Sequence, residues 1–383
     1  MIDCAQFYQY LLTKNIQFFC GVPDSLLKDF CAYITDHTPE HQHIINANEG
    51  NSIAIATGYY LATQNLPLVY MQNSGLGNAI NPLTSLTDKE VYGIPMLLMI
   101  GWRGHPDTPD EPQHIKMGRI NPALLKTLEI PYAVLPDTWN ELDAVVSSLL
   151  QNAYTDSTPV ALLIKTDTFS SYKLQKKIPQ VNNGLNRETA LSILVDYIDR
   201  QKMDNVVYIA TTGKLSRELY EYRDAKNQSH EQDFLTVGSM GHASQIALGI
   251  AIAQPDKTVI CLDGDGALLM HAGSLSTIGM LKPKNLIHIV FNNWSHDSVG
   301  GQPTAASQSN IALIAHATGY RKTLQITDKA LLVNNLDRII NEKGPLLLEI
   351  LVESGSRSNL GRPKTQPNEN KTSFMKTLAS KNK

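Results

Sequence analysis

The 383-residue sequence contains no apolar run that approaches the roughly 20 residues needed to span a bilayer. It also has no basic N-terminal region followed by an apolar stretch, the pattern of a secretory signal. We therefore expect a cytoplasmic protein that has no membrane partner. The formal net charge is −3, which gives no general attraction to nucleic acid. A polyanionic partner is not expected either.

Cysteine is scarce in this chain. Its four cysteines, Cys4, Cys20, Cys31 and Cys261, lie in separate segments and show no Cys-x-x-Cys spacing. Two of them, Cys20 and Cys261, stand within apolar, strand-like runs. The pattern predicts buried free thiols.

Twelve short apolar runs, six in each half and separated by helix-length segments, predict an α/β fold of two doubly wound parallel sheets. In the first half the runs cover residues 16–20, 43–47, 68–71, 96–100, 132–135 and 160–164. In the second half they cover residues 206–210, 234–237, 258–262, 286–291, 322–326 and 346–351.

The domain boundary is expected in a polar stretch over residues 170–187, which contains several lysines and a pair of asparagines and has linker composition. We expect an N-terminal domain over residues 1–169 and a C-terminal domain over residues 188–371. The Lys-rich residues 372–383 are expected to form a frayed helix or tail.

The segment Gly264-Asp265-Gly266 carries the strongest chemical signal, because it joins the apolar run at 258–262 to a helix-like segment at 268–280. Glycine lets a phosphate approach the backbone, and free N–H groups at a helix N-terminus face it. A neighbouring carboxylate would hold the Mg²⁺ that neutralises the phosphate oxygens. The next strand ends in Asn292-Asn293, and a parallel neighbouring strand would bring this pair close to Asp265.

We therefore expect three metal ligands: the carboxylate of Asp265, the side-chain carbonyl of Asn293 and the backbone carbonyl of Ser295. A Gly-Asp-Gly turn on its own occurs in many loops. Its position between an apolar strand and the asparagine pair of the next strand is what indicates a metal and diphosphate site.

These segments resemble the thiamine diphosphate motif, in which Gly-Asp-Gly is followed after a fixed interval by Asn-Asn. Across most of its length the sequence resembles the phosphonopyruvate decarboxylase family, with the sulfopyruvate decarboxylases as its nearest relatives. The supporting segments are GVPDS (21–25), NEG (48–50), GWRG (101–104), DEPQH (110–114), GSMG (238–241), SVGGQPT (298–304) and NLGRP (359–363). The resemblance implies two similar domains, one binding the aminopyrimidine and one the diphosphate, without a central domain.

The resemblance assigns roles to residues that are otherwise ambiguous. Glu49 opens a helical stretch, where it could be a carboxylate that merely favours the helix N-terminus. In the family a glutamate at this place binds the pyrimidine ring nitrogen and promotes proton transfer from the thiazolium. Met240, which alone would read as a core residue, is expected to support the bent cofactor. Further cofactor contacts are expected at Gly213, Ser239, Gly266 and Ala267.

Asp24 and His114 are the other catalytic candidates. Asp24 could simply cap a helix, but in related decarboxylases an acid in this turn handles protons near the thiazolium. His114 lies in a Pro-rich segment that either covers the substrate or is structural. Arg103 and Arg362, in Gly-containing loops, are candidates for binding the substrate anion, with ordinary surface arginine as the alternative for each.

The resemblance implies a carboxy-lyase that uses thiamine diphosphate and Mg²⁺ to convert 3-phosphonopyruvate to phosphonoacetaldehyde and carbon dioxide, a step of phosphonate (2-aminoethylphosphonate) biosynthesis. It also implies a site between two chains, hence a homodimer or a larger homo-oligomer. Sulfopyruvate decarboxylase is an open alternative, because sulfonate and phosphonate are both tetrahedral anions. A catalytically silent thiamine diphosphate-binding subunit is another, although the combination of Glu49, Asp265 and Asn293 argues against it.

Overall fold

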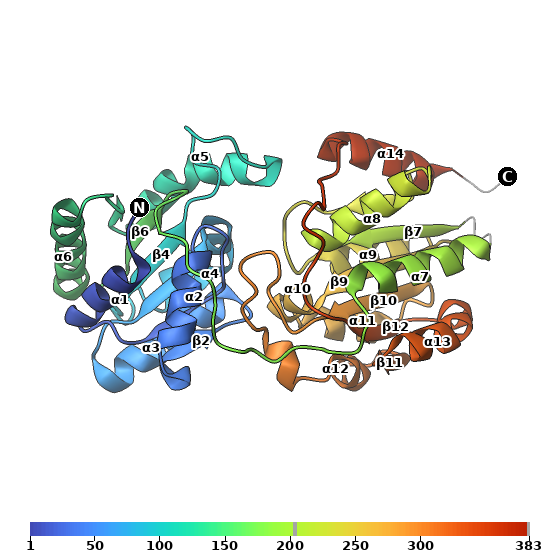
Figure 1. Cartoon of the computed structure of the whole chain (residues 1–383), viewed down its shortest axis with the longest axis horizontal. Helices are drawn as coiled ribbons and strands as arrows, with labels where there is room; N and C mark the ends of the chain where they lie inside the picture. The colour runs from blue at the N-terminus through green and yellow to red at the C-terminus, as the bar shows by residue number, and fades with distance from the viewer. Residues whose placement is uncertain (202–204, 381–383) are drawn as a thin grey trace. The chain divides into compact units, whose positions relative to one another are not determined.

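The computed structural model describes residues 1–201 and 205–380 and falls into two compact units, unit 1 (Met1–Ile178) and unit 2 (Pro179–Lys383). In each unit the described residues form a six-stranded sheet with helices packed on both faces (Figure 1). Every strand pairing is parallel. This confirms the predicted α/β class with two doubly wound parallel sheets.

Unit 1 has the strand order β2-β1-β3-β4-β6-β5. The strands are β1 (Phe19–Gly21), β2 (His43–Ile45), β3 (Leu68–Gln72), β4 (Leu97–Gly101), β5 (Tyr132–Val134) and β6 (Val160–Ile164). The α-helices are α1 (Cys4–Thr13), α2 (Lys28–His37), α3 (Glu49–Thr63), α4 (Leu76–Ser85), α5 (Pro112–Thr127) and α6 (Trp139–Asp156). Successive strand residues point to opposite faces, so Tyr70 and Met99 enter one core while Val69 and Leu98 enter the other.

Unit 2 has the strand order β11-β12-β10-β9-β7-β8. The strands are β7 (Val206–Ala210), β8 (Asp233–Leu235), β9 (Thr258–Gly264), β10 (Leu286–Asn292), β11 (Lys322–Ile326) and β12 (Leu346–Leu351). The α-helices are α7 (Arg187–Arg200), α8 (Lys214–Ala225), α9 (Ala243–Ala253), α10 (Asp265–Met270), α11 (Ser274–Leu281), α12 (Ile311–Ala317), α13 (Lys329–Asn341) and α14 (Pro367–Ala379). Numbered from the first strand of each unit, both sheets read 2-1-3-4-6-5, so the halves share one topology.

All twelve predicted strands are present, with ends that move by a few residues. The helix expected over residues 268–280 is wrong in its details, because α10 already begins at Asp265 and a break separates it from α11. His271 leaves the helical conformation, with φ −133° and ψ 47°. A Cβ at Gly241 would lie only 2.6 Å from the His271 ring, so the 238–241 loop packs closely against this break.

The C-terminal segment, expected to be a frayed helix or a tail, is helical over most of its length. Helix α14 continues to Ala379, and its Phe374 is buried in the core that covers one face of the unit 2 sheet. Residues 381–383 lie outside the described part of the chain. The helix is hard to recognise in a Lys-rich sequence because only two of its side chains, Asn370 and Phe374, are buried.

All four cysteines are buried and free, as the sequence predicted. In residues 1–201 and 205–380, no helix combines the length and the apolar character that crossing a bilayer requires.

Candidate functional site

The candidate cofactor residues of unit 2 lie where the strand order changes direction. The second strand of the unit, β8, pairs on one side of β7, and the third strand, β9, pairs on the other. Ligands of doubly wound folds bind outside the carboxyl ends of the strands at such a switch point. Gly213 follows β7 and Asp265 follows β9, so both residues stand at this point.

The register of β9 and β10 brings the two predicted side-chain ligands to the ends of adjacent strands. Gly264 is paired with Phe291, so Asp265 is one residue beyond this pair and Asn293 is two residues beyond it. Both side chains are buried. The loop after β10 then returns through a bridge between Ser295 and Pro303.

Asp265 is the first residue of α10 and is only 3% exposed. Burial, with a contribution from the negative charge of Asp297, raises its pKa to about 7, although hydrogen bonds oppose this shift. One of these bonds is donated by the Thr304 hydroxyl to Asp265 Oδ2 at 2.5 Å. Within the described residues, no lysine, arginine or histidine forms an ion pair with Asp265. A buried carboxylate that has no cationic side chain as a partner suits a site where a metal ion supplies the positive charge.

The raised pKa of Asp265 predicts a pH-dependent stability of the metal-free protein. The unfolded carboxyl ionises near pH 3.8 and the native one near pH 7, so the stabilisation is complete below pH 3.8 and is lost as the pH rises to about 7. We expect the free energy of unfolding of the Asp265→Asn variant to exceed that of the wild type by a margin that grows over this range. Urea unfolding without metal, at several pH values, measures it. A margin that is equal at pH 5 and pH 7.5 would contradict the burial of an ionisable carboxyl.

Asn293 has a fixed amide orientation. Its Nδ2 donates to Asp297 Oδ2 at 2.7 Å, and its Oδ1 accepts the backbone N–H of Ser295 at 3.0 Å. A carbonyl oxygen has two lone pairs, so Oδ1 can accept this hydrogen bond and still bind a cation. The donor set of carboxylate and carbonyl oxygens is the one that Mg²⁺ prefers.

A buried charge network that the sequence analysis missed supports Asn293. Asp297 Oδ2 also accepts from Arg187 Nη1 at 3.2 Å and from the Gly355 N–H at 3.0 Å. Arg187 in turn makes a bidentate pair with Glu218, with both N–O distances at 2.7 Å. Arg187 begins α7 and Glu218 lies within α8, and neither stands in a motif, so only the fold reveals their meeting.

The two asparagines of the pair have different contacts. Asn292 is fully buried and donates to Glu349 Oε1 at 2.7 Å, while its own oxygen accepts from the Trp294 N–H at 3.3 Å. Glu349 Oε2 accepts the Ala312 N–H at the start of α12. Asn292 therefore anchors the strand end, whereas Asn293 keeps an oxygen that can serve as a ligand.

The buried amide of Gln302, in the loop after β10, bears on whether a ligand fits beside this loop. Its side chain is 0% exposed, yet neither amide atom has a hydrogen-bond partner in residues 1–201 and 205–380. An orphaned buried amide is costly, so a bound group or an ordered water is needed to satisfy it. The Gln302 carbonyl accepts from His296 N at 2.8 Å, and Thr304 N donates to Trp294 O at 2.9 Å. The loop thus carries the amide next to Thr304, which contacts Asp265.

The remaining expected cofactor contacts of unit 2 surround the same strand ends. Gly213 has φ +102° and precedes α8, whose N-terminal N–H groups are suited to a phosphate. Burial lowers the pKa of the adjacent Lys214. The loop with Ser239 and the half-buried Met240 packs onto α10, because a Cβ at Gly241 would lie 2.8 Å from the carbonyl oxygen of Ala267. Gly266, which precedes Ala267 on α10, lies against the His296 ring.

Unit 1 holds Glu49 as a buried carboxyl at the start of α3. It is 5% exposed, and its Oε2 accepts from Asn78 Nδ2 at 2.7 Å. Burial raises its pKa above the ordinary value. A Cβ at Gly75 would collide with Glu49 Oε1, so only glycine leaves room for the acid there. Its environment favours the protonated form, which can donate a hydrogen bond.

Asp24 occupies the equivalent switch point of unit 1, between β1 and β3. It is fully buried; its Oδ1 accepts from Gln72 Nε2 at 2.6 Å, and its Oδ2 accepts from the Leu26 N–H at 2.9 Å. Burial raises its pKa despite these bonds and the positive charge of Arg103. A Cβ at Gly101 would collide with Asp24 Oδ2.

Arg103 and His114 belong to the same part of unit 1. The Arg103 guanidinium pairs with both carboxylate oxygens of Asp110 and donates to Ser25 Oγ at 2.8 Å. Burial, together with the charge of Arg103, lowers the pKa of His114 to about 4, so this imidazole is neutral at physiological pH. Arg362 lies in unit 2. The two predicted anion-binding arginines therefore belong to different units, and Arg103 already has a carboxylate partner.

Comparisons with known proteins show which family the chain belongs to. The family model of the thiamine pyrophosphate enzyme N-terminal TPP binding domain matches residues 4–121, and the model of the C-terminal TPP binding domain matches residues 211–350. The chain is similar to the phosphonopyruvate decarboxylase of Streptomyces viridochromogenes, with 34% identity covering 96% of this chain and 93% of that protein. The protein of that description from Streptomyces hygroscopicus is 32% identical, covering 96% and 92%. The sulfopyruvate decarboxylase of Methanosarcina acetivorans is 27% identical, covering 95% and 94%.

Proposed function

Because the chain belongs to the phosphonopyruvate decarboxylase family of thiamine pyrophosphate enzymes, we propose that it decarboxylates 3-phosphonopyruvate to phosphonoacetaldehyde and carbon dioxide. The observation that carries this proposal is similarity over almost the whole chain together with a buried carboxylate and amide at the ends of β9 and β10. The chain is a thiamine diphosphate-dependent carboxy-lyase that acts on a small molecule. Its role in phosphonate biosynthesis and its cytoplasmic location remain predictions.

Unit 2 offers the groups that would hold the diphosphate and its Mg²⁺. Asp265 would contribute an anionic oxygen, Asn293 Oδ1 would contribute a neutral one, and the Ser295 carbonyl would complete the protein ligands. The N-terminus of α8 after Gly213 and the turn at Gly266 provide backbone N–H groups for phosphate oxygens. When bound, thiamine diphosphate supplies the electron sink for decarboxylation. Assignment of Mg²⁺ rests on the oxygen-only donor set and on the raised pKa of Asp265.

Unit 1 supplies the proton-handling groups. Glu49 would share a proton with the pyrimidine ring through its other carboxyl oxygen, because its Oε2 already accepts from Asn78. The burial that raises the pKa of Glu49 keeps a proton available near neutral pH. The pKa of Asp24 is also raised by burial, so it can carry a proton beside the reacting centre. His114 is neutral and offers hydrogen bonds without charge.

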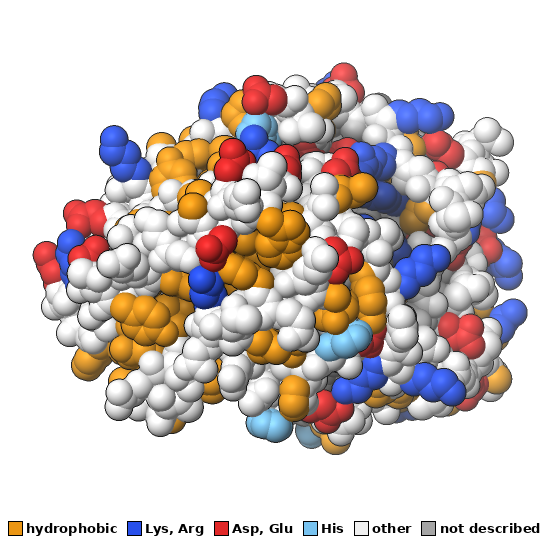
Figure 2. All heavy atoms as spheres, turned by 60° about the vertical axis from the view of Figure 1, so that its left-hand side comes forward, with side chains coloured by type: hydrophobic (Ala, Val, Ile, Leu, Met, Phe, Trp, Pro, Cys, Tyr) orange, Lys and Arg blue, Asp and Glu red, His pale blue; other side chains and the backbone are white. Residues whose placement is uncertain are grey.

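We also propose a homodimer or larger assembly in which Glu49 of one chain faces Asp265 of another. Helix α3, which begins at Glu49, carries the exposed apolar side chains of Ile55 and Leu61. Helix α9, which follows the loop with Met240, carries the exposed Ile252. Apolar side chains also reach the surface in groups on the face that Figure 2 draws. Contiguous exposed apolar surface is typical of protein interfaces, and a second copy of this chain is the partner that the proposed site requires.

The substrate assignment is tested by assaying purified protein with 3-phosphonopyruvate and sulfopyruvate side by side, with thiamine diphosphate and Mg²⁺ present. We expect aldehyde release, measured by trapping the aldehyde, with the larger kcat/KM for 3-phosphonopyruvate. A larger kcat/KM for sulfopyruvate would favour the second candidate, which the similarity to a sulfopyruvate decarboxylase supports. No aldehyde from either acid, although thiamine diphosphate binds, would indicate a silent cofactor-binding subunit.

Removal of the metal is expected to stop turnover. Without a cation, the buried Asp265 and the diphosphate oxygens repel each other, so the cofactor dissociates. Treatment with EDTA followed by gel filtration should abolish aldehyde formation, and Mg²⁺ together with thiamine diphosphate should restore it. Zinc added with thiamine diphosphate in place of Mg²⁺ is the control that shows whether any divalent ion restores activity. Full activity after chelation would rule out the proposed metal site.

A further inference from the structure

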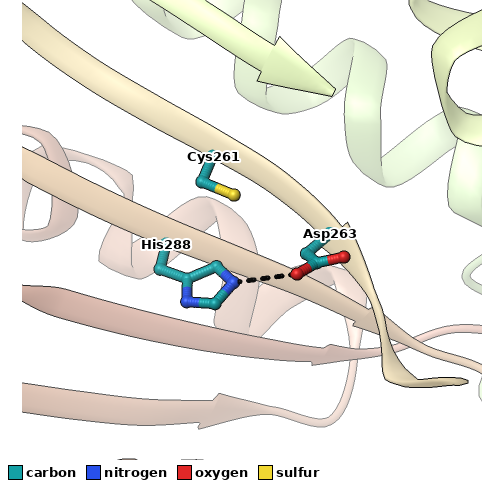
Figure 3. Close-up of side chains that lie close together, drawn as sticks. All are labelled: Cys261, Asp263 and His288. Carbon is teal, nitrogen blue, oxygen red and sulfur yellow. Dashed lines mark hydrogen bonds and ion pairs between the residues drawn. The ribbon is translucent and has the colours of Figure 1, made fainter. Parts of the chain in front are cut away.

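A buried polar cluster lies directly behind Asp265 in unit 2. Cys261 and Asp263 are on β9, His288 is on β10, and Tyr320 precedes β11. The first three are 0% exposed and Tyr320 is 3% exposed. Cys261 and Asp263 are two residues apart on one strand and His288 pairs with Cys261, so all three point to the same face of the sheet (Figure 3).

Hydrogen bonds join the cluster to the turn that carries Asp265. The Tyr320 hydroxyl is 3.1 Å from His288 Nδ1. Figure 3 shows the next contact, in which His288 Nε2 is 3.3 Å from Asp263 Oδ2. Asp263 Oδ1 accepts the backbone N–H of Gly264 at 2.9 Å. The chain of hydrogen bonds therefore runs from Tyr320, two residues before β11, through His288 on β10 and Asp263 on β9, to the peptide that precedes Asp265.

One assignment of protons satisfies every member of this chain. An ionised carboxylate only accepts, so Asp263 takes the Gly264 N–H on one oxygen and the His288 Nε2–H on the other. His288 Nδ1 then accepts the Tyr320 hydroxyl proton. The reverse assignment, with a protonated Asp263, would leave the Tyr320 hydroxyl hydrogen without an acceptor among the described residues. The satisfied chain has one fixed histidine tautomer.

A metal ion in this cluster is the competing interpretation. The ligand atoms of Cys261, Asp263 and His288 lie within 4.8 Å of one another, and such a mixed set can bind zinc. Zinc needs a thiolate, whereas burial and the charge of Asp263 raise the pKa of Cys261 well above its ordinary value. Because the hydrogen bonds already engage Asp263 and both ring nitrogens, the cluster needs no ion.

Gly264 links the hydrogen-bond chain to the metal and diphosphate site. Gly264 is the N-cap residue of α10, and its backbone is extended, with φ −115° and ψ 155°. A Cβ at this glycine would have no neighbour within 4 Å in the described part of the chain, so no side chain packs against its Cα. Sheet pairing with Phe291 places the residue, and the Asp263 carboxylate holds its N–H. A rotation of this peptide would move the start of α10, where Asp265 stands.

We propose that Tyr320, His288 and Asp263 are positioning residues that hold the Gly264 peptide so that Asp265 is oriented for the metal and diphosphate. The proposal rests on the proposed function, because it concerns the same cofactor. None of the three residues has to touch the cofactor. Their effect is on the affinity of the site, since a carboxylate that must be ordered on binding loses part of the binding free energy.

The test compares two substitutions of His288 by the affinity of the apoprotein for thiamine diphosphate at fixed Mg²⁺, measured by isothermal titration calorimetry without substrate. His288→Leu conserves volume but removes the donor to Asp263, and we expect roughly 10- to 100-fold weaker binding. His288→Gln keeps an N–H donor at the position of Nε2, and we expect affinity within a few-fold of the wild type.

Cys261→Ala is the matched control, because Cys261 is equally buried on the same face but is not part of the hydrogen-bond chain. It should lower the melting temperature and leave the affinity unchanged. Equal affinity of His288→Leu and the wild type would overturn the proposal. So would an affinity loss that merely follows the loss of melting temperature across His288→Leu and Cys261→Ala.

If His288→Leu does not fold, Tyr320→Phe decides the question, because it removes only the hydroxyl that fixes the tautomer. We expect about twofold to tenfold weaker binding, the effect of one hydrogen bond, and wild-type affinity would overturn the proposal. Failure of the proposed function has a different signature: the wild-type protein itself would show no Mg²⁺-dependent binding of thiamine diphosphate.

Discussion

Replacement of Asp265 by asparagine is expected to weaken Mg²⁺-dependent binding of thiamine diphosphate by roughly 10²- to 10⁴-fold. Removing one member of a buried ion pair costs about 3–5 kcal/mol, because the remaining charge is left uncompensated. Here the remaining charge is the cation, and Asp265 is the one carboxylate among the three proposed protein ligands. Asparagine keeps the shape of the side chain and can still accept the hydrogen bond from Thr304.

The measurement is a titration of the apoprotein with thiamine diphosphate at fixed Mg²⁺, followed by calorimetry. Asp256→Asn is the matched control, since Asp256 is an exposed residue of the same unit just before β9. It changes the net charge by the same amount and should leave the affinity at the wild-type level. An Asp265→Asn variant that binds as tightly as the control would show that the metal site lies elsewhere.

Substitution of Glu49 by glutamine is expected to lower kcat by about 10²- to 10⁴-fold, the usual contribution of a positioned proton-transfer group. The amide that replaces the carboxyl group has no acidic proton to share with the pyrimidine ring. The contact from Asn78 can persist, because an amide oxygen also accepts a hydrogen bond. Affinity for thiamine diphosphate should change far less than kcat.

Stability separates this catalytic role from a structural one. The folded pKa of Glu49 lies above the unfolded value of 4.5, so its stabilisation is present below pH 4.5 and is lost as the pH rises through the folded value. At pH 8 the Glu49→Gln apoprotein should therefore melt at the same temperature as the wild type or higher. Glu90→Gln, at an exposed position, is the control. A lower melting temperature for Glu49→Gln together with lost activity would mean that Glu49 serves the fold.

The sequence was sufficient for the fold because the strands are parallel and the inner strands of each sheet are buried on both faces. Such strands are continuous apolar runs, as in Val160–Ile164, and they are recognisable without knowledge of their partners. The break between α10 and α11 was not predictable, since it depends on His271 and Gly241 packing together. Contacts of this kind join residues whose local sequence gives no signal.

In the candidate site, too, local sequence indicates some residues and gives no signal for others. Asp265, Asn293 and Glu49 stand in short motifs whose spacing and neighbours indicate their chemistry. Arg187 contacts Asp297 across 110 positions of sequence, and His288 meets Asp263 only because β9 and β10 are adjacent. No local pattern marks these supporting residues. The separate contacts of Asn292 and Asn293 were likewise hidden, because the two residues are chemically identical and adjacent in the chain.

The close approach of Gly75 to Glu49 and of Gly101 to Asp24 has a further consequence for which substitutions these positions can accept. The backbone of each glycine lines the wall against which an acid lies, and even one added methyl group would occupy the place of a carboxylate oxygen. Each acid and its glycine therefore form a unit that must be inherited together. A lineage could lose either acid and later fill the space, but recovering the acid would first require the glycine to return.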